Sequence, residues 1–146
     1  MRLRHIKPEF FKDEKLGKQP LYARYLFIGL WMLADKNGCL EYSPRRIGVE
    51  VFPYDDFSRS ELLEEYYGPE PEGLCCENEP TPTEAVVELG LDSLVNGGFI
   101  HLYHDKNDKK CICIINFLKH QKRTSWEKKE SLEFVSPPTG FRPASA

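Results

Sequence analysis

Cysteine and histidine are the residue types in this chain that could bind a metal. His101, Cys111 and Cys113 lie in two alternating apolar segments, so their nitrogen and sulfur atoms could converge on one face of a hairpin. A structural zinc site needs a fourth ligand, which would have to come from Cys39 or the Cys75-Cys76 pair. Five cysteines with no sign of secretion are more simply explained as reduced thiols. We therefore expect no metal, no cofactor and no disulfide framework.

The sequence lacks the common catalytic motifs. It has no glycine-rich phosphate loop, no Gly-x-Ser-x-Gly elbow and no His-Glu-x-x-His pair. Asp55-Asp56 is the only paired carboxylate in a plausible loop, and adjacent aspartates there more often cap a helix than bind a metal. We therefore expect that the protein is not an enzyme.

Arginine and lysine side chains form three groups that could bind phosphate. Arg45 and Arg46 follow Ser43-Pro44, an expected helix start where free amides and guanidinium groups favour an anion. The second group occupies a hairpin tip, and the third follows the hairpin beside aromatic residues suited to unstacked bases. The predicted nucleic-acid-binding residues are Arg45, Arg46, Lys106, Lys109, Lys110, Lys119, His120, Lys122 and Arg123.

Each basic group also has a simpler interpretation. The hairpin lysines could only keep a solvated turn soluble, and the third group could be an ordinary surface helix. The two arginines could form an exposed helix start or a salt bridge to Asp55 or Asp56. Charge alone therefore leaves both interpretations open.

The charge is strongly segregated along the chain, although the formal net charge is only -3. Residues 50–92 contain thirteen acidic residues and one basic residue. Residues 106–129 contain eight basic and two acidic residues, and residues 1–30 contain seven basic and three acidic ones. Two basic ends therefore flank an acidic middle, which is compatible with binding a polyanion at the ends.

Three helices are each expected to begin with proline at the first helical position. The first starts at Pro20 and ends at Asn37-Gly38, and a short strand over 39–41 follows it. The second starts at Pro44, buries Ile47 and Val51, and stops before Pro53. The third starts with the capping box Thr81-Pro-Thr-Glu84, buries Val87, Leu91, Leu94 and Val95 on one face, and ends at Gly97-Gly98.

A hairpin follows the third helix, with strands over 99–104 and 110–116 and a turn centred on Asn107. Antiparallel pairing then sets Leu102 opposite Ile112 and Ile100 opposite Ile114, facing the core. The opposite, outward face carries His101, Tyr103, Cys111 and Cys113. This order of elements predicts an α+β fold, a winged helix-turn-helix with a two-stranded wing.

The predicted recognition helix is acidic. Its polar positions include Glu84, Glu88 and Asp92, and it contains no arginine or lysine. Since phosphates repel carboxylates, we expect this helix to bind a partner instead of reading bases.

The domain organisation follows from composition. Residues 1–123 are expected to form the winged-helix domain, with an acidic insertion at about 58–82 that holds a small helix through Leu62 and Leu63. Residues 124–146 are expected to form a proline-rich, flexible C-terminal extension. No apolar stretch approaches the about 20 residues of a membrane span, so we expect a cytoplasmic protein that does not bind membranes.

Several segments resemble a known family. They are Arg4–Phe11, Ala23–Trp31, Pro44–Ile47, Glu50–Asp56 and Ile115–Gln121. Together they resemble the N-terminal winged-helix domain of phage-encoded replisome-organiser or primosomal, DnaD-like replication proteins. The resemblance implies a phage or prophage protein that acts on DNA during replication initiation in a bacterial host cell.

Two functional hypotheses follow. In the first, the domain binds double- or single-stranded DNA mainly through phosphates, with low sequence specificity. In the second, the acidic insertion and the third-helix face bind a protein of a replication or phage complex, such as a helicase loader or a second copy of the chain.

Overall fold

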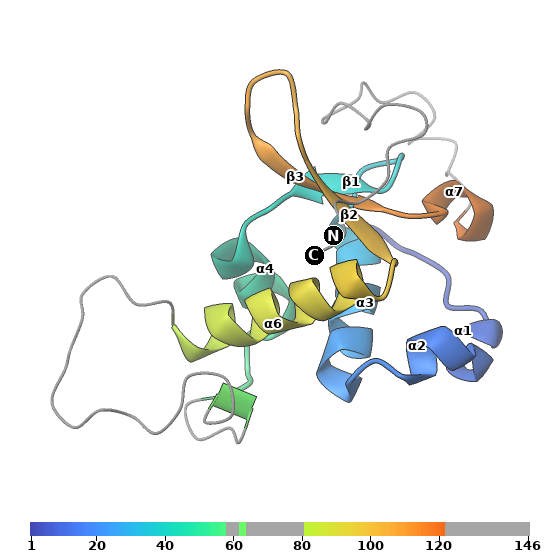
Figure 1. Cartoon of the computed structure of the whole chain (residues 1–146), viewed down its shortest axis with the longest axis horizontal. Coiled ribbons are helices and arrows are strands. Elements are labelled where there is room, and N and C mark those ends of the chain that lie inside the picture. Colours follow the sequence, from blue (N-terminus) through green and yellow to red (C-terminus); the bar gives the residue numbers. More distant parts are fainter. Residues whose placement is uncertain (58–61, 64–80, 122–146) are drawn as a thin grey trace, which may run out of the picture.

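Helices and a small antiparallel sheet make up the protein, as Figure 1 shows for the computed structural model. The structure describes residues 1–57, 62–63 and 81–121. Its elements are α1 (Glu9–Lys12), α2 (Glu14–Gly17), α3 (Leu21–Leu33), β1 (Cys39–Glu41), α4 (Pro44–Val51), α6 (Pro82–Asn96), β2 (Ile100–His104), β3 (Lys110–Ile114) and α7 (Phe117–His120). The α+β class is as predicted, and the order from α3 to β3 is compatible with a winged helix-turn-helix.

Hydroxyl side chains cap both α4 and α6, and the sequence predicts this cap for Thr81 of α6. The Ser43 Oγ accepts a hydrogen bond of 3.4 Å from the Arg46 amide, and Pro44 is the first residue of α4. The Thr81 Oγ1 accepts one of 3.3 Å from the Glu84 amide. Each cap satisfies an amide that has no partner within its helix.

The prediction for α3 is wrong at both ends. Pro20 is the N-cap, with an extended ψ of 151°, so the helix begins one residue later. It ends at Leu33 because the Asp35 carboxylate accepts hydrogen bonds from the amides of Asn37 and Cys39, at 2.8 and 3.0 Å. These bonds fold residues 35–38 into a turn that competes with further helix.

The hairpin has the predicted register. Ile100 lies opposite Ile114, and Leu102 lies opposite Ile112. The short strand β1 is also confirmed, and it pairs antiparallel with β3, giving a three-stranded sheet in the order β1-β3-β2. The two wing strands are thus part of a larger sheet in which β3 is central.

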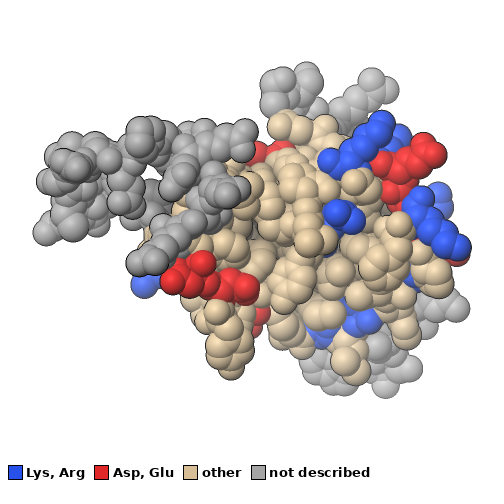
Figure 2. Space-filling view, turned by 90° about the horizontal axis from the view of Figure 1, so that it is seen from below, with Lys and Arg blue, Asp and Glu red and all other residues tan. Residues whose placement is uncertain are grey.

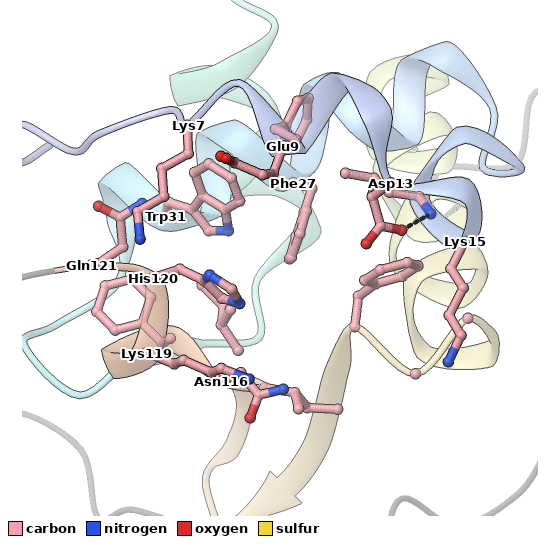
Figure 3. Close-up of a pocket in the computed structure, with 18 of the residues that line it drawn as sticks. Lys7, Glu9, Asp13, Lys15, Phe27, Trp31, Asn116, Lys119, His120 and Gln121 are labelled. Carbon is pink, nitrogen blue, oxygen red and sulfur yellow. Dashed lines mark hydrogen bonds between the residues drawn. The ribbon is translucent and has the colours of Figure 1, made fainter.

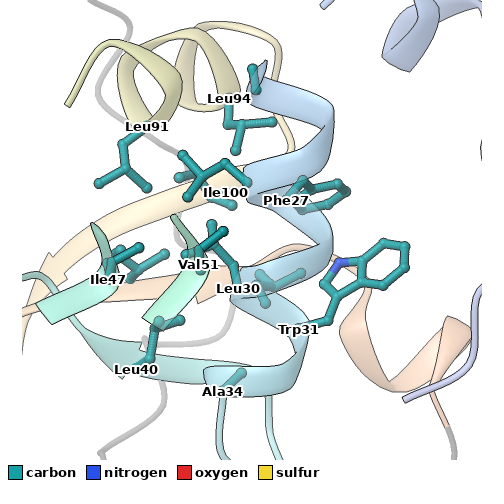
Figure 4. Close-up of a cluster of buried hydrophobic side chains, with 14 of the residues drawn as sticks. Phe27, Leu30, Trp31, Ala34, Leu40, Ile47, Val51, Leu91, Leu94 and Ile100 are labelled. Carbon is teal, nitrogen blue, oxygen red and sulfur yellow. The ribbon is translucent and has the colours of Figure 1, made fainter. Parts of the chain in front are cut away.

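The core lies between this sheet and helices α3, α4 and α6 (Figure 4). Leu30 of α3, Leu91 of α6 and Ile100 of β2 are fully buried, and Ile47 of α4 is 3% exposed. Burial of such side chains contributes about 1.5–3 kcal/mol each. The core therefore fixes how the start of α4 lies relative to the hairpin.

The N-terminal segment packs across the end of the sheet and holds α7 in place. The Gln121 side chain is buried, accepts a 3.0 Å hydrogen bond from the His5 amide and donates one of 2.6 Å to the His5 carbonyl. The Arg4 guanidinium donates to the Trp31 carbonyl at 3.0 Å and stacks 5.0 Å above the Phe117 ring. Residues at the two ends of the described chain thus form one structural unit.

Several predictions fall outside the described residues. They concern most of the insertion at 58–82, the extension at 124–146, and Lys122 and Arg123. Within the predicted small helix, the structure describes Leu62 and Leu63 as helical and half-buried. Among the described helices, none has the length and apolar character needed to cross a membrane.

Candidate nucleic-acid interface

The wing turn is built on one aspartate. The Asp105 Oδ1 accepts hydrogen bonds of 2.9 Å from both the Asn107 and Lys109 amides, and Asp108 adopts a left-handed φ of 60°. This arrangement closes the turn where the sequence predicts it, and it leaves Lys106, Lys109 and Lys110 exposed. The carboxylate of Asp105 therefore stabilises the turn, and the lysine side chains face the solvent.

Arg45 and Arg46 lie exposed in the first turn of α4. The Arg46 amide is already bonded to Ser43 Oγ, and the Ile47 amide is bonded to the Ser43 carbonyl at 2.9 Å. The expectation of free amides at this corner is therefore wrong for these two groups. Phosphate binding here would depend mainly on the guanidinium side chains.

The structure brings the wing tip and the start of α4 together. A single oxygen of Glu41, Oε2, lies 3.9 Å from Arg46 Nη1 and 3.6 Å from Lys109 Nζ. The Lys110 ammonium lies 4.0 Å above the centre of the Tyr42 ring. Two basic groups more than 60 residues apart in sequence are thus neighbours in space.

The register of β1 explains this convergence. Glu41 lies opposite Cys111, so the end of β1 lies beside the beginning of β3 and the wing turn. The Tyr42 amide continues the ladder by donating to the Lys110 carbonyl at 2.9 Å. Because Ser43 follows directly and caps α4, the first turn of α4 begins beside this edge of the sheet, and Arg46 lies near Lys109. We name Arg45, Arg46, Lys106, Lys109 and Lys110 the wing–α4 surface.

Acidic residues reduce the charge of the wing–α4 surface without cancelling it. Glu41, Glu50, Asp105 and Asp108 lie among the five cations, so a small positive local charge remains. The acidic partner of Arg46 in the structure is Glu41, whereas the sequence suggested Asp55 or Asp56. Exposed ion pairs of this kind contribute little to stability, so a phosphate can compete for the same cations.

Lys119 and His120 form a separate basic site. Both are exposed on α7, at the end of β3 opposite the wing. Five residues of strand separate the two ends by about 16 Å. The third predicted basic group is therefore not part of the wing–α4 surface, and its members Lys122 and Arg123 lie beyond the described residues.

The basic charge of the N-terminal segment is interleaved with acidic charge. In Figure 2, lysine or arginine and acidic side chains lie together on the right edge, near the position of α1 and α2 in Figure 1. The α1 and α2 sequences contain Glu9, Lys12, Glu14 and Lys15. This region is therefore not a uniform basic patch.

The second face of the hairpin differs from its prediction. Tyr103 and Cys111 do share one face with His101 and Cys113, but Tyr103 is only 7% exposed and Cys111 is fully buried beside Cys39. The prediction that this face points outward is therefore wrong for Tyr103 and Cys111. This face is a second, small core, because Cys39 of β1 lies opposite Cys113 and adds to it.

Burial changes the titration of this small core. It raises the pKa of Cys111 and Tyr103 and lowers the pKa of His101, since each charged form loses solvation. A hydrogen bond with Cys39, together with burial, raises the pKa of Cys113. Within residues 1–57, 62–63 and 81–121, no three His, Cys, Asp or Glu side chains are placed to hold a metal ion.

The acidic residues of α6 lie along one side of that helix. Glu84 and Glu88 are half-buried and Asp92 is exposed, while Val87, Leu91 and Leu94 are buried against the core. The predicted apolar face is confirmed. The use of the acidic side for a partner stays a prediction.

No protein-family model, curated protein or solved structure matches this chain. Sequence reasoning missed Glu41 and Tyr42, which hold Arg46, Lys109 and Lys110. The available signal was the short strand 39–41, whose pairing with the hairpin would have placed both residues beside the wing tip.

Proposed function

We propose that the protein binds DNA through phosphates, as a winged-helix protein that uses the wing–α4 surface. The observation that carries this proposal is the shared contact of Arg46 and Lys109 with Glu41 Oε2. It brings cations from a helix start and from a hairpin tip onto one surface, where they can contact adjacent phosphates.

The composition of this surface favours backbone contact over base recognition. Arginine and lysine are the side chains that bind phosphates most often, and both types occur here. Helix α6, which would enter the major groove in a standard winged helix, carries Glu84, Glu88 and Asp92 instead. Low sequence specificity follows, because few side chains are left to bond base edges.

The cellular role that we propose is replication of phage or prophage DNA. It is supported by the resemblance of segments such as Arg4–Phe11 and Ile115–Gln121 to replisome-organiser proteins. A replication factor that handles many sequences would benefit from a binding mode of low specificity. A helicase loader or a second copy of the chain would then bind elsewhere on the molecule.

A salt titration of binding to a duplex of random sequence tests the DNA proposal. The affinity should fall steeply with salt, and the logarithmic slope should decrease by about 0.9 for each phosphate contact removed. Replacing Arg45 and Arg46 by alanine should therefore weaken binding and lower the slope by up to about two units. Replacing Lys106, Lys109 and Lys110 should have a comparable or larger effect.

The matched control replaces Lys12 and Lys18, which are exposed and belong to the N-terminal segment. It removes the same charge as the arginine pair, so an effect of net charge alone would appear equally in both variants. The proposal fails if the protein does not bind DNA at low salt. It also fails if the control and the arginine variant weaken binding to the same extent.

A further inference from the structure

A second site lies at the opposite end of the sheet. A hollow of about 590 Å³ opens between the N-terminal segment with α1 and α2 on one side and α7 on the other (Figure 3). This volume falls within the range of small-ligand sites, about 300–1,000 Å³. We name it the α7 pocket.

Aromatic rings in mutual contact form the wall of the α7 pocket. Trp31 contacts Phe10 and Phe27 edge to face, with ring centres 5.4 and 5.1 Å apart, and Phe27 lies 5.6 Å from Phe99. Phe10 and Phe99 are half-buried, whereas Trp31 and Phe27 are only 9% and 7% exposed, so Phe10 and Phe99 give most of the surface that a ligand could contact. Figure 3 shows Trp31 and Phe27 behind them, pointing toward the same space. A wall of this kind offers stacking and edge contacts to a flat ring.

The rim of the pocket carries three lysines and two carboxylates, so its formal charge is only slightly positive. Lys7, Lys15 and Lys119 line it, against Glu9 and Asp13. One carboxylate oxygen of Asp13 already accepts a 2.8 Å hydrogen bond from the amide of Leu16, so it is engaged as the N-cap of α2. His5 and His120 add two polar rings, and Figure 3 shows His120 directed toward the hollow. The pocket thus combines an aromatic wall with three rim lysines that can each contact a phosphate.

The pocket is built before any ligand arrives. The reciprocal hydrogen bonds between Gln121 and the His5 backbone join its two sides, and Arg4 bonds Trp31 on one side while stacking on Phe117 on the other. Because these contacts hold the walls apart and in place, a ligand would lose little free energy in ordering the site.

We propose that the α7 pocket takes up an unpaired base of single-stranded DNA, with the rim lysines contacting the flanking phosphates. A nucleotide combines an aromatic ring with negative charge, which matches the wall and the rim together. Base pairs inside a duplex are stacked and cannot enter such a hollow, so the site is specific for single strands. This inference rests on the proposed DNA binding but uses different residues.

Fluorescence of Trp31 provides the test. The chain has two tryptophans, so Trp126→Phe leaves Trp31 as the only one. The probes are an oligothymidine and an abasic oligodeoxynucleotide of equal length, which carry the same phosphates. Oligothymidine should change the emission of Trp31 and bind at least about fivefold more tightly than the abasic strand. Equal affinity for both strands, or an unchanged emission, would overturn the proposal.

Two substitutions separate this site from the wing–α4 surface. Phe10→Ala should remove the preference for thymine over the abasic strand, and Lys119→Glu should weaken oligothymidine binding. Lys12→Glu is the matched control for charge, because Lys12 is exposed and outside the pocket. Equal effects of the two charge reversals would count against the pocket.

The failure of this inference can be distinguished from failure of the proposed function. Replacing Arg45 and Arg46 should reduce duplex binding and preserve the preference for oligothymidine over the abasic strand. Phe10→Ala should preserve duplex binding and remove that preference. If Phe10→Ala and the unaltered protein prefer oligothymidine over the abasic strand to the same extent, the pocket inference fails. Duplex binding by the wing–α4 surface is not affected by that result. Quenching of Trp31 by an apolar peptide but not by oligothymidine would assign the pocket to a protein partner and refute the proposal.

Discussion

Replacing Gly38 by alanine should strongly destabilise the fold, because this residue is constrained in two ways. Its φ is +83°, a left-handed conformation that costs other L-residues about 1–2 kcal/mol. A Cβ atom added there would lie 2.5 Å from Cβ and 2.6 Å from Cγ of Phe117, the first residue of α7. Overpacking of this kind costs about 1–3 kcal/mol. We therefore expect Gly38→Ala to lower the free energy of unfolding by about 2–5 kcal/mol.

Two other glycines separate the two effects. Gly98 has a similar φ of +78° but no atom within 4 Å of an added Cβ, so Gly98→Ala should cost only the backbone strain of about 1–2 kcal/mol. Gly17 has neither a positive φ nor a neighbour within 4 Å. Gly17→Ala should be neutral or stabilise the protein by about 0.4–1 kcal/mol, since alanine restricts the unfolded chain.

Urea unfolding followed by circular dichroism measures these differences. The midpoints should rank Gly17→Ala highest, Gly98→Ala next and Gly38→Ala lowest, with unchanged m-values. If Gly38→Ala and Gly98→Ala lower the stability equally, Phe117 does not press against Gly38. The position of α7 relative to the turn before β1, and with it one wall of the α7 pocket, would then be wrong.

Three further predictions test other parts of the structure. Glu41→Gln frees both cations held by Oε2. In a salt titration, duplex binding should therefore strengthen several-fold at low salt, and the salt slope should increase. The control Glu14→Gln changes the charge equally and should have less effect. Burial lowers the pKa of His101 below its ordinary value of 6.5, so the unfolded state binds more protons than the folded state near pH 6. Thermal unfolding should therefore show that stability falls as the pH drops below about 6.5. The fall should be less steep in His101→Gln. Asp35 is 3% exposed and accepts hydrogen bonds from two amides, which Asp35→Ala would leave without this acceptor. Chemical denaturation should show that the free energy of unfolding falls by about 3 kcal/mol. A decrease below about 1 kcal/mol would contradict those hydrogen bonds.

Local features were predictable from the sequence because local interactions decide them. The helix start at Ser43-Pro44 and the cap at Thr81 depend on residues within one helical turn. The register that pairs Leu102 with Ile112 depends on a short turn and on alternating apolar residues. The candidate wing lysines were found for the same reason.

Features that join distant segments were not predictable in this way. Alternation assigns Tyr103 to a face of the hairpin but does not reveal that this face is buried with Cys39. A lone glutamine such as Gln121 carries no periodic signal, although its bonds to His5 help to shape the α7 pocket. The turn at Asp35 shortens α3 through side-chain acceptors that compete with helical hydrogen bonds, and propensity alone does not decide that competition.

The pairing of β1 with β3 has a consequence for how the protein folds. Hairpin β2–β3 can form locally, but Glu41 must find Cys111 across a loop of about 70 residues that contains the segment between α4 and α6. The entropy of closing such a loop grows only with the logarithm of its length, so doubling it costs about 0.6 kcal/mol. Evolution could therefore lengthen that segment at little thermodynamic cost while slowing folding. Since Arg46 and Lys109 are linked through Glu41 of β1, a chain in which β1 has not yet joined the sheet would lack the assembled wing–α4 surface.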